Sequence, residues 1–331
     1  MKVIGIVTSG GDAPGMNAAI RAITRMASHL NMDVYGIYHG YAGLINDEIT
    51  RLDTRKVGDI LHRGGTFLKT ARCPEFKTEA GQAKAIANLK RYGMEGLAVI
   101  GGDGSFHGAL ALQKWGIKVV GIPGTIDNDI PCTDFTIGFD TAVNTVVESV
   151  NKIRDTATSH ERTFVVEVMG RNCGDLALCS GLAGGAEVIL IPEVEPNYDE
   201  VCRRVQKSHD QEKSHAVVIV AEGVGGDPNS RNIDDSSAFR VANYIKEKTK
   251  LDTRVTILGH IQRGGSPTVN DRLLASRMGA EAAKALAEDD TGKMIAVQDG
   301  KIVRVDLEYA LSQKKTVKKE YVELASMLAS V

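Results

Sequence analysis

The sequence lacks the features that would place the protein in a membrane, outside the cell or on nucleic acid. No apolar run approaches the roughly 18 residues that cross a bilayer, and the apolar stretch of "MKVIGIVTSGG" is too short for a signal peptide. The 40 basic and 42 acidic residues leave a net charge of -2, so no broad basic face is expected to attract a polyanion. We therefore expect a cytoplasmic protein.

Cysteine patterns that would indicate disulfides or zinc are also missing. The five cysteines form no CxxC pair, and no histidine lies near them at metal-ligand spacing. Free thiols in a reducing compartment are the simplest interpretation. The cysteines are Cys73, Cys132, Cys173, Cys179 and Cys202.

Buried strands alternate with helical segments along the chain. Runs such as "LAVIGG", "KVVGIPG" and "AVVIVAEG" are apolar at consecutive positions, which is typical of strands buried on both faces of a parallel sheet. Between such runs, Ile20, Ile23 and Ala27 recur at helical spacing. This alternation predicts an α/β fold with right-handed crossovers. The 331 residues suffice for about two domains of roughly 150 residues each.

Glycine is abundant, with 35 residues, and it gathers where predicted strands end. In "VTSGGDAPGMNAAI" a strand, a glycine turn and a helix start follow one another, so backbone N–H groups there can hold a phosphate. It is not a Walker loop, because Met16 follows Gly15 where Lys and Ser/Thr are required. "VIGGDGSFHGA" repeats the design and adds Asp103. For both, glycines that serve only a tight turn remain the alternative.

Asp127 and Asp129 lie two residues apart in "PGTIDNDIP", a run with no basic residue. Carboxylates this close need a metal ion, a proton or solvent to compensate their charge. Beside glycine loops, Mg²⁺ and a proton-accepting base would both require such residues, whereas a solvated acidic loop is the plain alternative.

Arginine accompanies the glycine turns. "HRGGTF" and "QRGGSP" share an Arg-Gly-Gly-hydroxyl pattern, and a guanidinium beside flexible backbone suits phosphate binding. His260 and Arg263 follow a further predicted strand, and Arg72, Arg162 and Arg171 lie near strand ends or glycine turns. Each arginine alone would be a solvated charge, but acidic strand ends, glycine loops and arginines together predict phosphoryl transfer between anionic partners.

Six stretches, in order and spread over nearly the whole chain, resemble those of bacterial ATP-dependent 6-phosphofructokinases. They are "TSGGDAPGMNAAIR", "HRGGTFLKTARCPEF", "GGDGS", "PGTIDNDI", "VVEVMGRNCGD" and "LGHIQRGGSP". The resemblance implies two similar Rossmann-like α/β domains with mainly parallel sheets and helices on both faces, assembled as a homotetramer. It places an ATP-binding large domain at 1–138 plus 262–315 and a fructose 6-phosphate-binding small domain at 139–261 plus 316–331.

The resemblance also implies the reaction, in which the 1-hydroxyl of fructose 6-phosphate attacks the γ-phosphate of ATP at a committed step of glycolysis. Asp127 is implied as the general base, Asp103 as the Mg²⁺ ligand and Asp129 as their support. The other implied catalytic residues are Thr125, Arg171 and Gly11. The implied ATP contacts are Gly11, Arg72, Cys73, Gly102, Asp103, Gly104 and Ser105. The implied sugar-phosphate contacts are Thr125, Asp127, Arg162, Met169, Gly170, Arg171, Glu222, Arg254, His260 and Arg263, of which Arg162 and Arg254 belong to a neighbouring subunit in the family.

Two glycines bear on the phosphoryl donor. Gly104 and Gly124 resemble the ATP-using branch, whereas the pyrophosphate-using branch carries Asp and Lys there. Cys73, Lys77 and His107 depart from the residues common in the adenine pocket, so nucleotide preference stays open. A pyrophosphate-dependent phosphofructokinase and a catalytically silent nucleotide sensor are the alternative functions.

Effector binding is the part of the resemblance that departs most from the family pattern. An allosteric site for ADP or phosphoenolpyruvate is implied at Arg21, Arg25, Arg154, Glu187, Lys213 and His215. Thr54 and Gln211 stand where basic residues are common, which predicts diminished or altered allostery. The segment "GVGGDPNSRNIDDSS" at 223–237 reads as an exposed loop that is longer than usual.

Overall fold

The computed structural model describes residues 1–210, 215–226 and 235–328, and its contacts divide the chain into two compact units. The first unit comprises residues 1–126, 130–141 and 263–315. The second unit comprises residues 127–129, 142–262 and 316–331. In the described part of the chain, no helix is long and apolar enough to cross a membrane.

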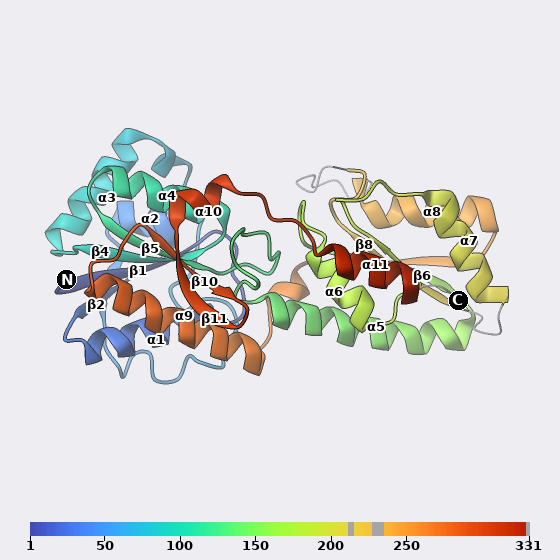
Figure 1. Ribbon diagram of the computed structural model, residues 1–331, viewed down its shortest axis with the longest axis horizontal. Coiled ribbons are helices and arrows are strands. Elements are labelled where there is room, and N and C mark those ends of the chain that lie inside the picture. The colour runs from blue at the N-terminus through green and yellow to red at the C-terminus, as the bar shows by residue number, and fades with distance from the viewer. Residues whose placement is uncertain (211–214, 227–234, 329–331) are drawn as a thin grey trace. The chain divides into compact units, whose positions relative to one another are not determined.

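The first unit is built on a seven-stranded sheet with the order β11-β10-β5-β4-β1-β2-β3 (Figure 1). Its strands are β1 (Val3–Ser9), β2 (Asp33–Ile37), β3 (Ile49–Leu52), β4 (Gly96–Gly101), β5 (Lys118–Pro123), β10 (Lys293–Gln298) and β11 (Lys301–Asp306). The central strands pair in parallel, whereas β3 and β11 pair antiparallel with their neighbours at the two edges. The sheet is therefore mixed but mainly parallel.

Helices cover both faces of this first sheet (Figure 1). On one face, α1 (Met16–His29) packs against α9 (Val269–Ala287). The other face carries α2 (Gly40–Asn46), α3 (Glu79–Arg91), α4 (Asp103–Lys114), α10 (Leu307–Ser312) and the short 3-10 helix η1 (Pro74–Lys77). Ile20, Ile23 and Ala27 are fully buried on α1, as their spacing predicts.

The second unit has a four-stranded parallel sheet with the order β7-β8-β6-β9. Its strands are β6 (Thr163–Val168), β7 (Val188–Leu190), β8 (Ala216–Ala221) and β9 (Thr253–Ile257). Its helices are α5 (Phe139–His160), whose first three residues belong to the first unit, α6 (Asp175–Ala183), α7 (Tyr198–Ser208), α8 (Ser237–Thr249), α11 (Lys319–Leu328) and the 3-10 helix η4 (Gly259–Arg263), whose last residue is also in the first unit.

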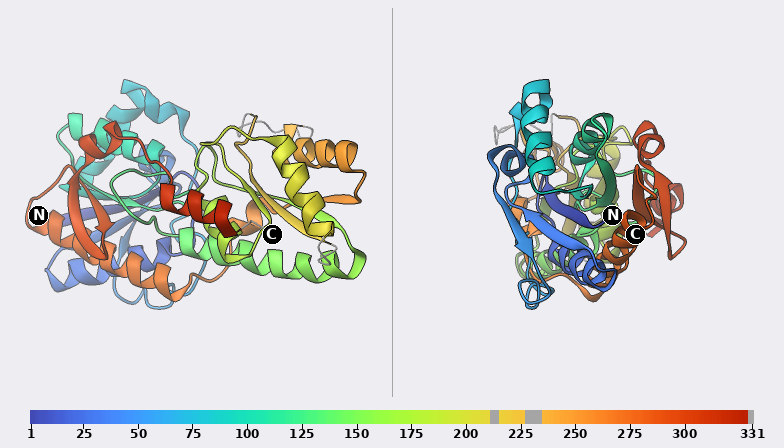
Figure 2. Two further views of the ribbon diagram at one scale, coloured as in Figure 1. Left: turned by 45° about the vertical axis from the view of Figure 1, so that its right-hand side comes forward. Right: turned by 90° about the vertical axis from the view of Figure 1, so that its left-hand side faces the viewer.

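The helices of the second unit also form two layers. α8 contacts β6, β8 and β9 and packs beside α7, while α6 contacts β7 and β8. The C-terminal helix α11 lies along α6 (Figure 2). Burial explains the apolar strand "AVVIVA", since every residue of β8 is buried. The predicted α/β fold, with two mainly parallel sheets covered by helices, is confirmed.

Candidate active site

Three loops of the first unit follow neighbouring parallel strands and therefore lie at one edge of the sheet. In the strand register Ser9 aligns with Gly101, and Gly101 aligns with Pro123. The loops after β1, β4 and β5 consequently begin side by side. Gly10 and Gly15 have φ of 85° and 105°, a left-handed backbone that favours glycine. The glycine turn after β1 thus has a conformational reason and also leads into the start of α1.

Side-chain hydrogen bonds tie these loops together. The Ser105 hydroxyl donates to the Ser9 carbonyl at 2.9 Å, which joins the start of α4 to the end of β1. The Thr136 hydroxyl donates to the Thr125 carbonyl at 2.6 Å, which fixes the loop after β5. Gly102 precedes α4 with no side-chain cap, so the first N–H groups of α4 are available to an anion.

Asp103 is exposed at the first turn of α4. Its Oδ2 lies 3.4 Å from Nδ1 of His107, one helical turn further on. The described residues contain no group of three or more metal-ligating side chains. A magnesium ion here would therefore take Asp103 together with nucleotide phosphates and water, which is how proteins usually hold it.

The two Arg-Gly-Gly stretches lie against each other in the first unit. A Cβ added to Gly64 would stand 2.3 Å from the Gly265 carbonyl oxygen, and the Ser266 hydroxyl donates to the His62 carbonyl at 2.7 Å. Their shared sequence pattern thus corresponds to a spatial pairing, in which the missing side chain of Gly64 permits the close approach of the other segment.

Asn17 on α1 anchors the first of these stretches. Its Nδ2 donates to the carbonyls of Arg63 and Gly64 at 3.1 and 3.2 Å, and its Oδ1 accepts the Phe67 N–H at 2.5 Å. Sequence reasoning missed this buried asparagine, although its place inside "GGDAPGMNAAI" was a signal.

Arg263 lies beside the glycine loop that follows β1. A Cβ added to Gly11 would come within 2.5 Å of the Arg263 Nη1, so any side chain at position 11 would displace this guanidinium. The structure therefore brings two predicted phosphate contacts, Gly11 and Arg263, together within the first unit.

The predicted nucleotide residues differ in their surroundings. Arg72 is exposed. Cys73 precedes η1 and packs against the core of the first unit. In that core the ring of Phe76, a residue of η1, stacks on Tyr41 with centroids 4.1 Å apart. A Cβ added to Gly104 would meet nothing within 4 Å, whereas one at Gly124 would lie 3.1 Å from Ile100. Gly104 thus leaves open space, whereas a side chain at Gly124 would also crowd Ile100 in the core.

A second cluster lies at the carboxyl edge of the sheet in the second unit. Val168 aligns with Ala221 and Glu167 with Ile257, so the segments after β6, β8 and β9 gather there. The Glu222 Oε1 accepts the Arg171 N–H at 2.8 Å. The buried Gln262 accepts the Met169 N–H at 3.2 Å through Oε1 and donates to the Gly259 carbonyl at 2.9 Å.

These bonds join Met169, Gly170 and Arg171 to Glu222 and to the helical turn that carries His260. Gln262, which sequence reasoning left without a role, is the link between two of the three segments. Its burial inside "GHIQR" could be recognised only with the fold in hand.

Asp127 faces Arg171 in this second cluster. The Arg171 Nε lies 3.5 Å from the Asp127 Oδ2; the aspartate side chain is 4% exposed and the arginine 53%. Arg171 has a φ of 52° and follows Gly170 at 133°, so this turn holds a non-glycine residue in a sparsely populated conformation. Asn128 donates to Asp175 at 2.8 Å, which secures the segment that carries Asp127.

Burial raises the pKa of Glu222 above its ordinary value. The Arg171 N–H lowers this pKa and the neighbouring Asp127 raises it, but desolvation is the largest influence. A half-buried carboxyl beside a buried aspartate and a guanidinium is an arrangement that can hold and move protons.

Two predicted sugar-phosphate residues lie elsewhere in the second unit. Arg162 directly precedes β6 and Arg254 is the second residue of β9, so both stand at the amino edge of the sheet. Both donate to the Asp252 Oδ2, at 2.7 and 3.1 Å. Within one chain the structure does not bring Arg162 and Arg254 together with Arg171 and Glu222.

The predicted effector residues are divided between the two units. In the second unit Arg154 lies 3.6 Å from Glu187, and the buried Glu187 also accepts the Val217 N–H at 2.5 Å. His215 is buried in the same unit. Arg21 and Arg25 lie on α1 of the first unit, where burial and then Arg25 lower the pKa of Arg21. Lys213, Gln211 and residues 227–234 of the predicted loop lie outside the described residues.

The fold and these clusters define an α/β protein with glycine-rich loops at strand ends and a buried acid paired with arginine. The chain belongs to the phosphofructokinase family, whose model matches residues 3–286. The resemblance found in the sequence is thereby confirmed.

Several relatives are similar over the whole chain. An ATP-dependent 6-phosphofructokinase of Bacillus pumilus is 56% identical over 99% of this chain and 100% of its own, and one of Bacillus cereus is equally similar with the same coverage. Among solved structures, phosphofructokinase from Saccharomyces cerevisiae is 37% identical with a TM-score of 0.87. That alignment covers 99% of this chain and 47% of the yeast chain, so this chain spans about half the yeast chain's length.

Proposed function

We propose that this protein is an ATP-dependent 6-phosphofructokinase, a glycolytic kinase that converts fructose 6-phosphate to fructose 1,6-bisphosphate. The observation that carries the proposal is the 56% identity, over the full length, to relatives that bear this name. The Asp127–Arg171 pair of the second unit and, separately, the three glycine-rich loops of the first unit support it, because phosphoryl transfer depends on positioned charge and a proton acceptor.

The residues of the first unit hold the nucleotide in this proposal. Backbone N–H groups at Gly11 and at the start of α4, from Gly102 to Ser105, bind phosphate oxygens, and Arg72 adds a cation. Cys73 adjoins the nucleotide. Asp103 holds Mg²⁺, which supplies charge neutralisation on the phosphates.

The residues of the second unit hold and activate the sugar phosphate. Met169, Gly170 and Glu222 bind the sugar, and Asp127 accepts the proton of its 1-hydroxyl. That oxygen forms a bond to the γ-phosphorus while the bond to the β-phosphate oxygen breaks, and ADP leaves. Arg171 stabilises the charge that develops, Thr125 lies by the transferred phosphoryl group, and Asp129 supports Asp127 and the metal.

The 6-phosphate is bound by Arg162, Arg254, His260 and Arg263. We further propose a cytoplasmic homotetramer in which Arg162 and Arg254 serve a neighbouring subunit. Arg21, Arg25, Arg154, Glu187, Lys213 and His215 bind an ADP or phosphoenolpyruvate effector, whose influence is weakened by Thr54 and Gln211.

Product formation from fructose 6-phosphate, Mg²⁺ and either ATP or pyrophosphate tests the proposal. We expect fructose 1,6-bisphosphate with ATP alone, and a loss of about a thousandfold in kcat for Asp127→Ala, since a general base contributes 10² to 10⁴-fold. Asp155→Ala, at an exposed position of α5, is the matched control.

Turnover with pyrophosphate in place of ATP would contradict the donor assignment. The open space at Gly104 favours ATP, because a larger side chain there would occupy room that the nucleotide needs. If the native chain and Asp127→Ala both bind nucleotide and neither turns over, the protein is a nucleotide sensor.

A further inference from the structure

Asp252 stands between two arginines at the amino edge of the sheet in the second unit. It directly precedes β9, while Arg162 directly precedes β6, and the neighbouring strands align Thr163 with Thr253. The Asp252 carbonyl also accepts the Thr163 N–H at 3.1 Å. The backbone of Asp252 is therefore held in place by the sheet, at a position from which its side chain reaches both guanidinium groups.

A single carboxylate oxygen accepts from both arginines. The Asp252 Oδ2 lies 2.7 Å from Nε of Arg162 and 3.1 Å from Nη2 of Arg254. A guanidinium has five N–H donors, and this contact with Arg162 uses Nε, leaving the terminal nitrogens outside it. Two cations that would otherwise repel each other are thus held close together and share one counter-charge.

Both guanidinium groups remain accessible. The side chains of Arg162 and Arg254 are 30% and 50% exposed, and that of Asp252 is 46% exposed. A pair of exposed, oriented guanidinium groups is suited to a phosphate dianion, which accepts several charge-assisted hydrogen bonds at once.

We propose that Asp252 is a positioning residue for the 6-phosphate of the sugar, acting through Arg162 and Arg254 without touching the substrate. The inference rests on the proposed function. It deepens that function by assigning the anion-binding geometry of both arginines to one carboxylate.

Two other roles for Asp252 predict different results. An exposed ion pair with no further role contributes little, so its removal would leave sugar-phosphate binding unchanged. A carboxylate that competes with phosphate for the arginines would, when removed, strengthen sugar-phosphate binding. A positioning residue gives the opposite sign, because the released arginines repel each other and lose their orientation.

Steady-state kinetics of Asp252→Asn on the full-length protein separates these roles. We expect the half-saturating concentration of fructose 6-phosphate to rise about tenfold, as for the loss of one charge-assisted hydrogen bond. kcat, half-saturation by ATP and the melting temperature should stay close to native values. Asp252→Glu, which restores the carboxylate, should recover most of the binding, and Glu247→Gln on the exposed face of α8 is the charge-matched control.

A double-mutant comparison shows whether Asp252 acts through the arginines. In an Arg162→Gln, Arg254→Gln background, Asp252→Asn should have almost no further effect, whereas a full additional tenfold loss would overturn the proposal. An unchanged or lower half-saturation in Asp252→Asn alone would also overturn it.

The failure of this inference is distinguishable from that of the proposed function. A native protein that phosphorylates fructose 6-phosphate, with Asp252→Asn indistinguishable from it, contradicts only the positioning role. If the native protein does not use this substrate, the melting temperatures of the native protein and of Asp252→Asn, measured at increasing concentrations of inorganic phosphate, test the positioning role. A smaller phosphate-induced rise in melting temperature for Asp252→Asn than for the native chain supports the site, and an equal rise overturns it.

Discussion

Glu222 titrates at a higher pH than an ordinary glutamate, because burial disfavours its charged form. As the pH falls, this carboxyl therefore takes up a proton before exposed glutamates do and loses part of its capacity to accept hydrogen bonds. We therefore expect the half-saturating concentration of fructose 6-phosphate to rise in the native protein while the pH is still above 4.5, the ordinary glutamate pKa. In Glu222→Gln, binding should be about tenfold weaker at pH 8 and nearly independent of pH.

Kinetics at a series of pH values on both proteins measures this difference. The same pH dependence in Glu222→Gln as in the native protein would show that another group is responsible.

At the scale of single residues, the sequence predicts side chains that directly follow strands. Asp103 and Asp127 could be singled out because loops at the carboxyl ends of parallel strands meet at one edge. Asp252 could not, since its contact with Arg162 depends on the register between β6 and β9, two strands about ninety residues apart in the chain. Gln262 escaped notice because its partner is a backbone N–H, which leaves no sequence signature.

Helix α5 begins at a buried aspartate from another helix. Asp271 on α9 accepts the N–H groups of Gly138 and Thr141 at 2.8 Å each, and the Thr141 hydroxyl at 2.5 Å. Burial raises the pKa of Asp271 to about 6, although these three hydrogen bonds lower it. The first backbone N–H groups of α5 therefore bind a carboxylate whose ionised form is destabilised by burial.

This raised pKa predicts a dependence of stability on pH. The folded state binds the proton more tightly than the unfolded state, so this group stabilises the fold at low pH and that contribution is lost as the pH rises from about 4 to about 6. The change is on the order of 3 kcal/mol. Urea unfolding at each pH should show that this component is absent in Asp271→Asn and retained in Asp155→Asn. If the unfolding free energy of Asp271→Asn changed with pH as much as that of the native protein, the assignment to Asp271 would be refuted.

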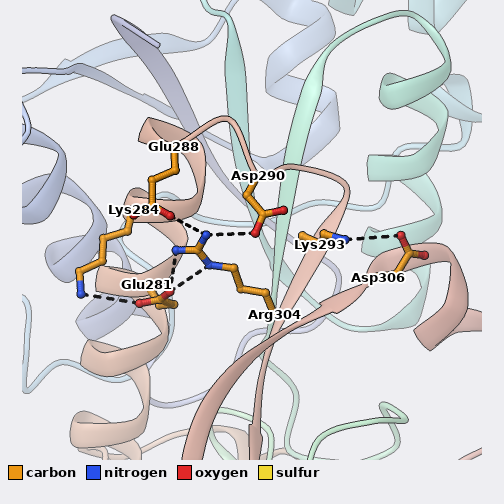
Figure 3. Close-up of polar contacts among 7 residues, drawn as sticks. All are labelled: Glu281, Lys284, Glu288, Asp290, Lys293, Arg304 and Asp306. Atoms are coloured by element: carbon orange, nitrogen blue, oxygen red, sulfur yellow. Dashed lines mark hydrogen bonds and ion pairs between the residues drawn. The ribbon is translucent and has the colours of Figure 1, made fainter.

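The antiparallel edge strand β11 is joined to α9 through Arg304 (Figure 3). Its guanidinium contacts Glu281 at 2.7 Å, Glu288 at 2.7 Å and Asp290 at 3.0 Å, and its side chain is 19% exposed. Burial alone would lower the pKa of Arg304, but the hydrogen bonds to these carboxylates outweigh it and raise the pKa. One arginine thus offsets part of the repulsion among three carboxylates.

Replacing Arg304 should therefore destabilise the first unit. We expect Arg304→Ala to lower the unfolding free energy by about 2 kcal/mol, since three acidic groups lose their partly buried counter-charge. The unfolding free energy of Arg304→Lys should lie between those of the native protein and Arg304→Ala, because an ammonium keeps the charge but cannot reproduce the guanidinium fork. Thermal unfolding measures the effect, and high salt should reduce it. A melting temperature of Arg304→Ala equal to the native value would contradict this role.

At the scale of elements, periodicity predicts the parallel strands and the helices better than the edge strands. β4 and β8 are apolar throughout, and β5 is apolar after Lys118, because both their faces are covered. β3 and β11 are partly exposed along most of their length, so their sequences carry no continuous apolar run. Each of these two strands pairs with a single neighbouring strand, and the antiparallel direction of that pairing makes the sheet mixed.

At the scale of the whole molecule, the second unit separates residues that the proposed reaction needs together. Arg162 and Arg254 stand at the amino edge of its sheet, whereas Arg171 and Glu222 stand at the carboxyl edge. β6 has six residues, and at about 3.3 Å per residue the two edges are about 20 Å apart. No side chain spans that distance. If all four residues bind one sugar phosphate, at least two chains must contribute to each site.

Mixing two defective variants, assayed at a fructose 6-phosphate concentration too low to saturate the arginine variant, tests this arrangement. Asp127→Ala chains keep both arginines, and Arg162→Gln, Arg254→Gln chains keep the base, so a mixed assembly contains sites with every group in its native form. Random reassembly of equal amounts should restore about a quarter of native activity if each site draws on two chains. Asp127→Ala chains mixed with a triple variant that carries all three substitutions supply no native base and should stay inactive. Failure of the first mixture to regain activity, when size-exclusion chromatography shows mixed assemblies, would mean that the arginines of one chain do not complete a site that contains Asp127 of another.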